Sequence, residues 1–99
     1  MRELCLNLLC SPTVEEGLLD LLLEIDEIEI FTSFSTSSYG GDAERLSASE
    51  QVLGRSGSVQ LQVLLTNTVL TVLIERIQAS FSGTGIRYWV TPIAAEGEI

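Results

Sequence analysis

A chain of 99 residues with 14 acidic side chains, five arginines and no lysine carries a formal net charge of −9. This charge disfavours DNA or RNA as a partner, because phosphate backbones bind clustered Lys and Arg. The length predicts one domain over residues 1–99, and 45% apolar residues with a mean hydropathy of +0.34 are more than so small a monomer readily buries.

Two residue types further limit the function classes. There is no histidine, which removes Ser–His and Cys–His nucleophile pairs and the commonest transition-metal ligand, so we expect no enzyme. Cys5 and Cys10 are an odd number of positions apart in a predicted strand, so their side chains point to opposite faces. Two reduced thiols therefore predict a cytoplasmic protein. The sequence shows no apolar run of about 18 residues for a membrane helix and no signal-peptide cleavage pattern.

The N-terminal part predicts a strand followed by a helix. Residues 3–10 alternate as a half-buried strand does. Ser11 is a favoured N-cap residue, and Pro12 fits the first helical position. An apolar stripe then recurs at helical spacing, formed by Val14, Leu18, Leu21, Leu22 and Ile25.

A second strand is predicted over residues 27–34, with Ile28 and Phe34 on one face and Phe31 on the other. The turn before it carries four acidic residues, Glu24, Asp26, Glu27 and Glu29. Carboxylate oxygens bind hard cations, yet a solvated acidic turn is the interpretation that we favour.

Residues 35–58 predict a long polar connection, well beyond the about 12–15 residues usual for a compact domain. Residues 35–42 have the composition of a mobile tip, with Gly40 and Gly41 as a hinge. Residues 46–53 contain a potential capping box and apolar side chains, so we expect this half to dock on the body or on a neighbouring subunit. Tyr39 is expected to be an exposed aromatic residue near the tip.

The second half predicts a strand over residues 59–66, a helix over residues 67–81 and a strand over residues 86–93. Thr66 or Asn67 is expected to cap the helix, and Gly83 to end it. The resulting β-α-β-β-α-β order predicts an α+β, ferredoxin-like fold, a four-stranded antiparallel sheet with two helices on one face.

The other face of this sheet is too apolar for water and too polar for a monomer core. Its predicted apolar members are Cys5, Leu9, Phe31, Leu64, Trp89 and Ile93, and the interleaved polar ones are Asn7, Gln60, Gln62 and Thr91. A symmetric homo-oligomer that packs this face accounts for both observations. The alternative is a monomer with scattered exposed apolar groups.

The segment Gly83-Thr84-Gly85 permits a sharp turn and could direct backbone amides at a phosphate, although a helix cap alone also explains it. The segment G-T-G-I-R-Y-W-V-T-P-I that begins there, together with E-Q-V-L-G-R at residues 50–55, resembles a small PII-like family of unknown function associated with heavy-metal efflux. This family is related to the nitrogen-regulatory PII proteins, whose signalling loop occupies the position of residues 35–58.

The resemblance implies a homotrimer with clefts between subunits for a small ligand, a nucleotide or a metal ion. It also implies signalling through the loop to a partner, such as a membrane transporter or a regulator. The implied ligand-binding residues are Gly83, Thr84, Gly85, Arg87, Glu50, Gln51, Gly54 and Arg55, and the implied docking residues are Tyr39, Gly40 and Gly41. One departure concerns phosphate contact: Ile86 stands where PII proteins have a lysine, and Arg87 follows on the opposite face.

Two other families remain as alternatives. One is the CutA family of divalent-cation tolerance proteins, which shares this topology, although a chain without histidine lacks its usual metal chemistry. The other is the ACT type of amino-acid-binding regulatory module, which usually has short loops and forms dimers.

Overall fold

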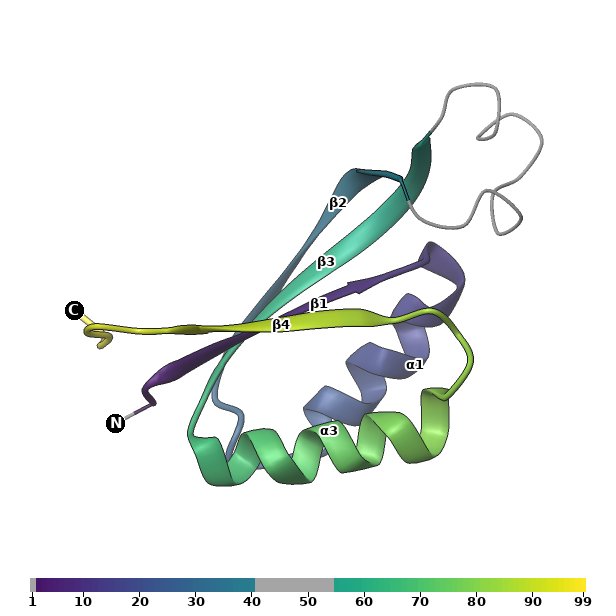
Figure 1. The fold of residues 1–99 in the computed structure, drawn as a ribbon. Coiled ribbons are helices and arrows are strands. Elements are labelled where there is room, and N and C mark those ends of the chain that lie inside the picture. The colour runs from purple at the N-terminus through teal and green to yellow at the C-terminus, as the bar shows by residue number, and fades with distance from the viewer. Residues whose placement is uncertain (1, 41–54) are drawn as a thin grey trace.

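The computed structural model of the chain describes residues 2–40 and 55–99 (Figure 1). Its sheet has the strand order β2-β3-β1-β4, with every neighbouring pair antiparallel. This is the predicted ferredoxin-like arrangement. The elements are β1 (Leu4–Cys10), α1 (Pro12–Leu23), β2 (Phe31–Tyr39), β3 (Arg55–Leu65), α3 (Asn67–Phe81) and β4 (Arg87–Pro92).

The hydrophobic core lies between α1, α3 and one face of the sheet, hereafter the helix face. Alternate residues of β1 and β3 meet the predicted stripe of α1 and the buried side of α3. Each aliphatic side chain removed from water there contributes about 1.5–3 kcal/mol. The fully buried members are Leu6, Leu8, Leu18, Leu22, Leu61, Val63, Leu65 and Leu73.

The N-termini of the two helices are capped differently. Pro12 occupies the start of α1 as predicted, but the Ser11 side chain makes no capping hydrogen bond and contacts Thr13 Oγ1 instead. Thr66 caps α3, because its Oγ1 accepts a hydrogen bond from the Val69 amide at 3.3 Å. The Asn67 amide donates to the Glu3 carboxylate at 3.0 Å, which satisfies a second orphan donor of this helix.

The predicted position of the second strand was wrong. β2 begins at Phe31, and the preceding segment turns back on α1, with the Ile28 amide donating to the Ile25 carbonyl at 3.1 Å. Ile28 is therefore buried by a turn and not by a strand. Phe31 pairs with Val63 and packs against the core, whereas Phe34 pairs with Gln60 on the opposite face. The predicted faces of these two aromatic residues are thus interchanged.

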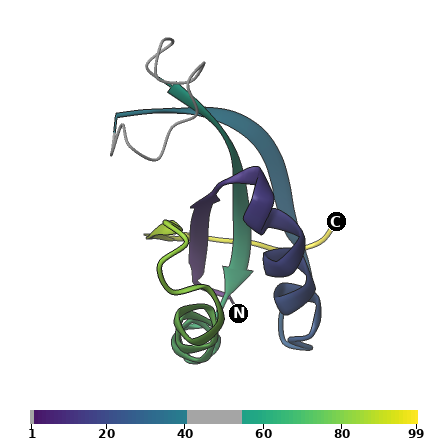
Figure 2. The same ribbon diagram turned by 90° about the vertical axis from the view of Figure 1, so that its right-hand side faces the viewer.

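Both ends of the predicted loop are paired strand. Residues 35–39 were expected to be mobile, but they pair with residues 55–59, from Ser35 opposite Val59 to Tyr39 opposite Arg55. The two strands form a ribbon that extends beyond β1 and both helices (Figures 1 and 2). Its strands consist mostly of Ser, Thr and Gly, so its sequence has no apolar alternation. The predicted docking of residues 46–53 lies outside the described residues.

Candidate functional site

A tight turn after α3 is formed by the residues predicted to bind a ligand. The Thr84 amide and hydroxyl both donate to the Phe81 carbonyl, at 3.2 and 2.6 Å. Ser82 has φ −56° and ψ 134°, and Gly83 has φ +83°. These angles define a type II turn, whose third position favours glycine. Gly85 also has a positive φ of +84°, so Gly83, Thr84 and Gly85 together form the segment that we call the glycine turn.

A pocket of 170 Å³ lies on the helix face beside the glycine turn. Its walls are mostly apolar, from the end of α3 and the start of β4, and include Ile77, Phe81, Ile86 and Tyr88. An apolar cavity of about 150 Å³ holds a benzene-sized group, so this volume admits a small ring or a branched aliphatic group. Among the described side chains, none that lines the pocket is charged.

Arg87 lies on the opposite face of the sheet from the pocket, as predicted. It is exposed and pairs in register with Leu9, whereas Ile86 packs against the core. Among arginine side chains in the described part of the chain, Arg2 and Arg76 form ion pairs with glutamates, and Arg87 forms none.

The face that carries Arg87, hereafter the open face, is mixed in character as predicted. Phe34, 44% exposed, takes the place expected for Phe31, and Trp89 is 42% exposed. Where side chains are described, the strand residues on this face include no acid. They are Cys5, Asn7, Leu9, Thr32, Phe34, Thr36, Ser38, Ser58, Gln60, Gln62, Leu64, Arg87, Trp89 and Thr91.

The remaining predicted site residues are only partly described. Glu50, Gln51, Gly54 and Gly41 lie outside the described residues. Arg55 begins β3 opposite Tyr39 at the far end of the ribbon. Tyr39 is 71% exposed, as expected, and Gly40 has φ +83°. The glycine turn and the ribbon leave the same end of the sheet (Figure 1), so the fold brings the two predicted regions to one end of the molecule.

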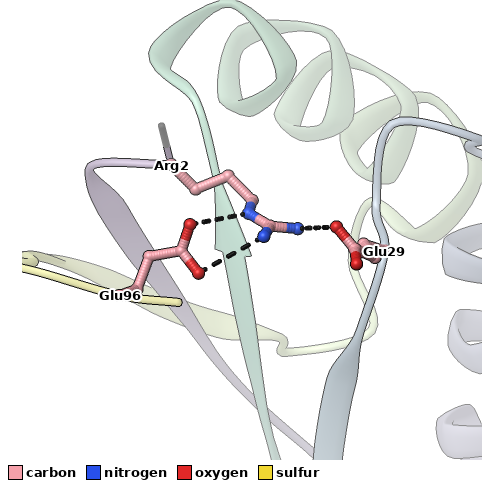
Figure 3. A network of polar contacts seen from close by, with 3 residues as sticks. All are labelled: Arg2, Glu29 and Glu96. Carbon is pink, nitrogen blue, oxygen red and sulfur yellow. Dashed lines mark hydrogen bonds and ion pairs between the residues drawn. The ribbon is translucent and has the colours of Figure 1, made fainter. Parts of the chain in front are cut away.

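Two of the four acidic residues in the turn after α1 form ion pairs. Glu24 accepts from Arg76 of α3 at 2.7 Å. Glu29 accepts from Arg2 at 2.6 Å, and the same guanidinium binds both carboxylate oxygens of Glu96 at 3.2 and 3.3 Å (Figure 3). The pKa of Arg2 is raised, mainly by the hydrogen bond to Glu29 and next by the hydrogen bond to Glu96. No group of three or more potential metal ligands occurs among residues 2–40 and 55–99.

The two cysteines are buried on opposite faces, Cys5 on the open face and Cys10 in the core. Burial, and secondarily the negative charge of Glu15, raises the pKa of the Cys10 thiol. No helix within the described part of the chain is long and apolar enough to cross a membrane.

Sequence reasoning missed the pocket and the Arg2 network. The pocket depends on how the end of α3 meets β4, and its lining residues resemble ordinary core positions. Arg2 and Glu96 are 94 positions apart, and no local pattern connects them.

Comparisons with known proteins agree with this geometry. A family model described as a protein of unknown function, DUF3240, matches residues 1–99. The crystal structure of a DUF3240 family protein from Shewanella baltica is 15% identical, with a TM-score of 0.82 over 100% of this chain and 98% of that chain. No curated protein sequence matches the chain.

Two further structures share the fold. A nitrogen regulatory PII-like protein from Thiomonas intermedia, bound to ADP, AMP and bicarbonate, is 16% identical with a TM-score of 0.75, covering 98% of this chain and 96% of that chain. The periplasmic divalent cation tolerance protein CutA from Archaeoglobus fulgidus is 13% identical with a TM-score of 0.72, covering 97% of this chain and 88% of that chain. Likeness at these identities shows the fold.

Proposed function

The chain belongs to the DUF3240 family of proteins of unknown function, and from this premise we propose that it is a PII-like regulatory protein. It binds a small anionic ligand, of the adenine nucleotide class, in clefts between subunits. It is not an enzyme, and it acts on a partner protein through the segment at the end of the β2–β3 ribbon.

The observation that carries this proposal is the position of Arg87, two residues after the glycine turn. Arg87 has no ion-pair partner among the described residues, although the chain has a net charge of −9. An arginine fork binds phosphate or carboxylate oxygens in a bidentate manner. Backbone amides held by glycines at positive φ add further donors for an anion. The adenine nucleotides and bicarbonate bound to the Thiomonas protein are anions of this kind.

A homotrimer is part of the proposal, because the open face supports contact between copies. This face combines exposed Phe34 and Trp89 with interleaved amides and carries no acid on its described strand residues. Packing it against another copy would bring Arg87 to the edge of a subunit interface. A cleft there would use residues from two copies.

Calorimetric titration with ADP, AMP and bicarbonate tests the proposal, first with the wild-type chain and then with Arg87→Gln. We expect saturable binding of at least one of these anions, and a loss of about tenfold or more in affinity for Arg87→Gln, because a charge-assisted hydrogen bond contributes about 1.5–3 kcal/mol. Arg76→Gln is the matched control, since Arg76 is bound to Glu24 on the helix side. Equal affinities of the two variants for the anion would show that Arg87 does not contribute to the binding site.

A titration with Cu²⁺ and Zn²⁺ separates the CutA-like alternative from this proposal. Binding of metal without binding of nucleotide would favour a cation-tolerance protein. Amino-acid binding by a dimer would instead favour an ACT-type module. We further propose a cytoplasmic location, from the two reduced thiols, and a metal-efflux transporter as the partner. Co-purification with membranes from cells that express such a transporter would test the latter.

A further inference from the structure

An amide pair occupies the centre of the open face. Asn7 lies in register between Gln62 of β3 and Trp89 of β4, with Cys5 and Leu9 on either side of it along β1. Only 4% of Asn7 is exposed, although neither α1 nor α3 packs on this face. A buried asparagine in an apolar setting lowers stability unless its amide is well hydrogen-bonded.

The hydrogen bonds of this pair are long and use only part of its capacity. Asn7 Nδ2 donates to the Cys5 carbonyl at 3.4 Å, and Gln62 Nε2 donates to Asn7 Oδ1 at 3.4 Å. Typical N–H···O distances are about 2.9–3.0 Å. Each side-chain amide has two donors and an acceptor oxygen with two lone pairs. With no other partner among the described residues, the Gln62 oxygen and further amide hydrogens remain available.

The charge of the open face favours a second copy of the chain as its occupant. Copies with a net charge of −9 repel one another wherever acidic surfaces meet. The described strand residues of the open face include no acid and a single cation, Arg87. This is therefore a surface on which two copies can meet without opposing carboxylates, whereas a basic partner would gain nothing from it.

We propose that Asn7 and Gln62 form the polar centre of the interface between copies and determine how many copies assemble and in which register. The exposed Gln62 amide hydrogen-bonds to polar groups of neighbouring copies, and the buried Asn7 oxygen positions it by accepting from Gln62 Nε2. Arrangements that place these amides against apolar side chains leave them unsatisfied and are disfavoured. A buried asparagine sets the number of strands in coiled coils in the same way, at a cost in stability. This inference rests on the assembly proposed above and adds what specifies it.

The experiment measures assembly mass by native mass spectrometry and analytical ultracentrifugation for the wild type, Asn7→Leu and Gln62→Leu. We expect one assembly for the wild type and a mixture of stoichiometries for both variants, because a purely apolar face no longer excludes other registers. Gln62 is exposed in the single chain, so Gln62→Leu tests the idea even if Asn7→Leu does not fold. Circular dichroism checks folding of each variant.

A third variant tests the charge argument. Asn7→Asp places a carboxylate at the centre of the acid-free face, and we expect the dissociation constant of the assembly to rise on the order of a hundredfold. Thr68→Asp is the control, since Thr68 is exposed in the first turn of α3, where an acid is favourable. Trp89, the single tryptophan of the chain, reports dissociation through its fluorescence.

The outcomes separate this inference from the proposed assembly. A wild-type chain that stays monomeric at all concentrations would overturn both. A wild-type trimer accompanied by single, unchanged assemblies of Asn7→Leu and Gln62→Leu would overturn only the role of the amide pair. An unchanged dissociation constant for Asn7→Asp would show that this face is not the interface.

Discussion

Replacing Gly83 by alanine isolates the conformational cost of the glycine turn. Gly83 has φ +83°, and a Cβ atom added there would meet no atom within 4 Å. The substitution therefore introduces no clash, and its effect arises from the backbone alone. Left-handed geometry costs a non-glycine residue about 1–2 kcal/mol, and the lower entropy of the unfolded alanine chain offsets about 0.4–1 kcal/mol of this. We expect a net loss of about 1 kcal/mol.

Gly97→Ala provides the matched control. A Cβ atom at Gly97 also meets no atom within 4 Å, but its φ is not positive. This substitution is expected to leave stability unchanged or to raise it by less than about 1 kcal/mol. Gly83→Asn should fall between wild type and Gly83→Ala, because asparagine tolerates the left-handed region better than alanine.

Urea unfolding followed by Trp89 fluorescence and circular dichroism measures these differences. The midpoint should fall for Gly83→Ala while the slope stays constant. The melting temperature should fall by about 4–8 °C per kcal/mol for a domain of this size. All variants must be compared at one protein concentration, since assembly contributes to apparent stability. If Gly83→Ala were as stable as Gly97→Ala, the positive φ at position 83 would not explain why a glycine is favourable there.

Three further predictions concern the core, the Arg2 network and Cys10. Leu73→Ala should lower the free energy of unfolding by about 2–5 kcal/mol, because Leu73 is fully buried, whereas Val72→Ala next to it, 49% exposed, should change it by less than about 0.5 kcal/mol in the same urea experiment. Arg2→Gln should increase hydrogen exchange after Pro92, because Arg2 is the residue that binds Glu96, whereas Arg76→Gln should not; equal exchange in both would contradict an anchoring role. The pKa of Cys10 is raised, so the unfolded chain releases the thiol proton at lower pH than the folded chain does. The stability that the neutral Cys10 thiol contributes is therefore fully present below the ordinary thiol pKa of about 8.5 and decreases as the pH rises through the pKa of the folded state. Cys10→Ala should lack this decrease in urea midpoints measured between neutral and alkaline pH, and a decrease of equal slope in the variant would assign it to other groups.

The fold was predictable because most elements follow simple patterns. Leu6, Leu8, Leu61 and Val63 alternate on β1 and β3, and the periodicity of α3 predicts its bounds of Asn67–Phe81. The second strand was misplaced because Glu27-Ile28-Glu29-Ile30 alternates like a strand. In the structure a turn buries Ile28, while Ile30 remains 60% exposed.

The candidate site was predictable only where residue types or their alternation determine the backbone conformation or the face on which a residue lies. Two glycines separated by one residue after a helix indicate a tight turn, and the structure has both at positive φ. Strand alternation also placed Arg87 on the face opposite Ile86. The ribbon was missed because strands rich in Ser and Thr have the same composition as a loop. The Arg2 network was missed because it depends on contacts between distant segments.

The ribbon formed by β2 and β3 also has a mechanical consequence. From Phe34 to Tyr39 there are five residue steps, or about 17 Å at about 3.3–3.4 Å per step. A rotation of about 10° at Phe34 therefore displaces Tyr39 by about 3 Å. Because Phe34 and Gln60 share the row of Leu9 and Arg87 across the sheet, a small tilt of that row is magnified at Tyr39.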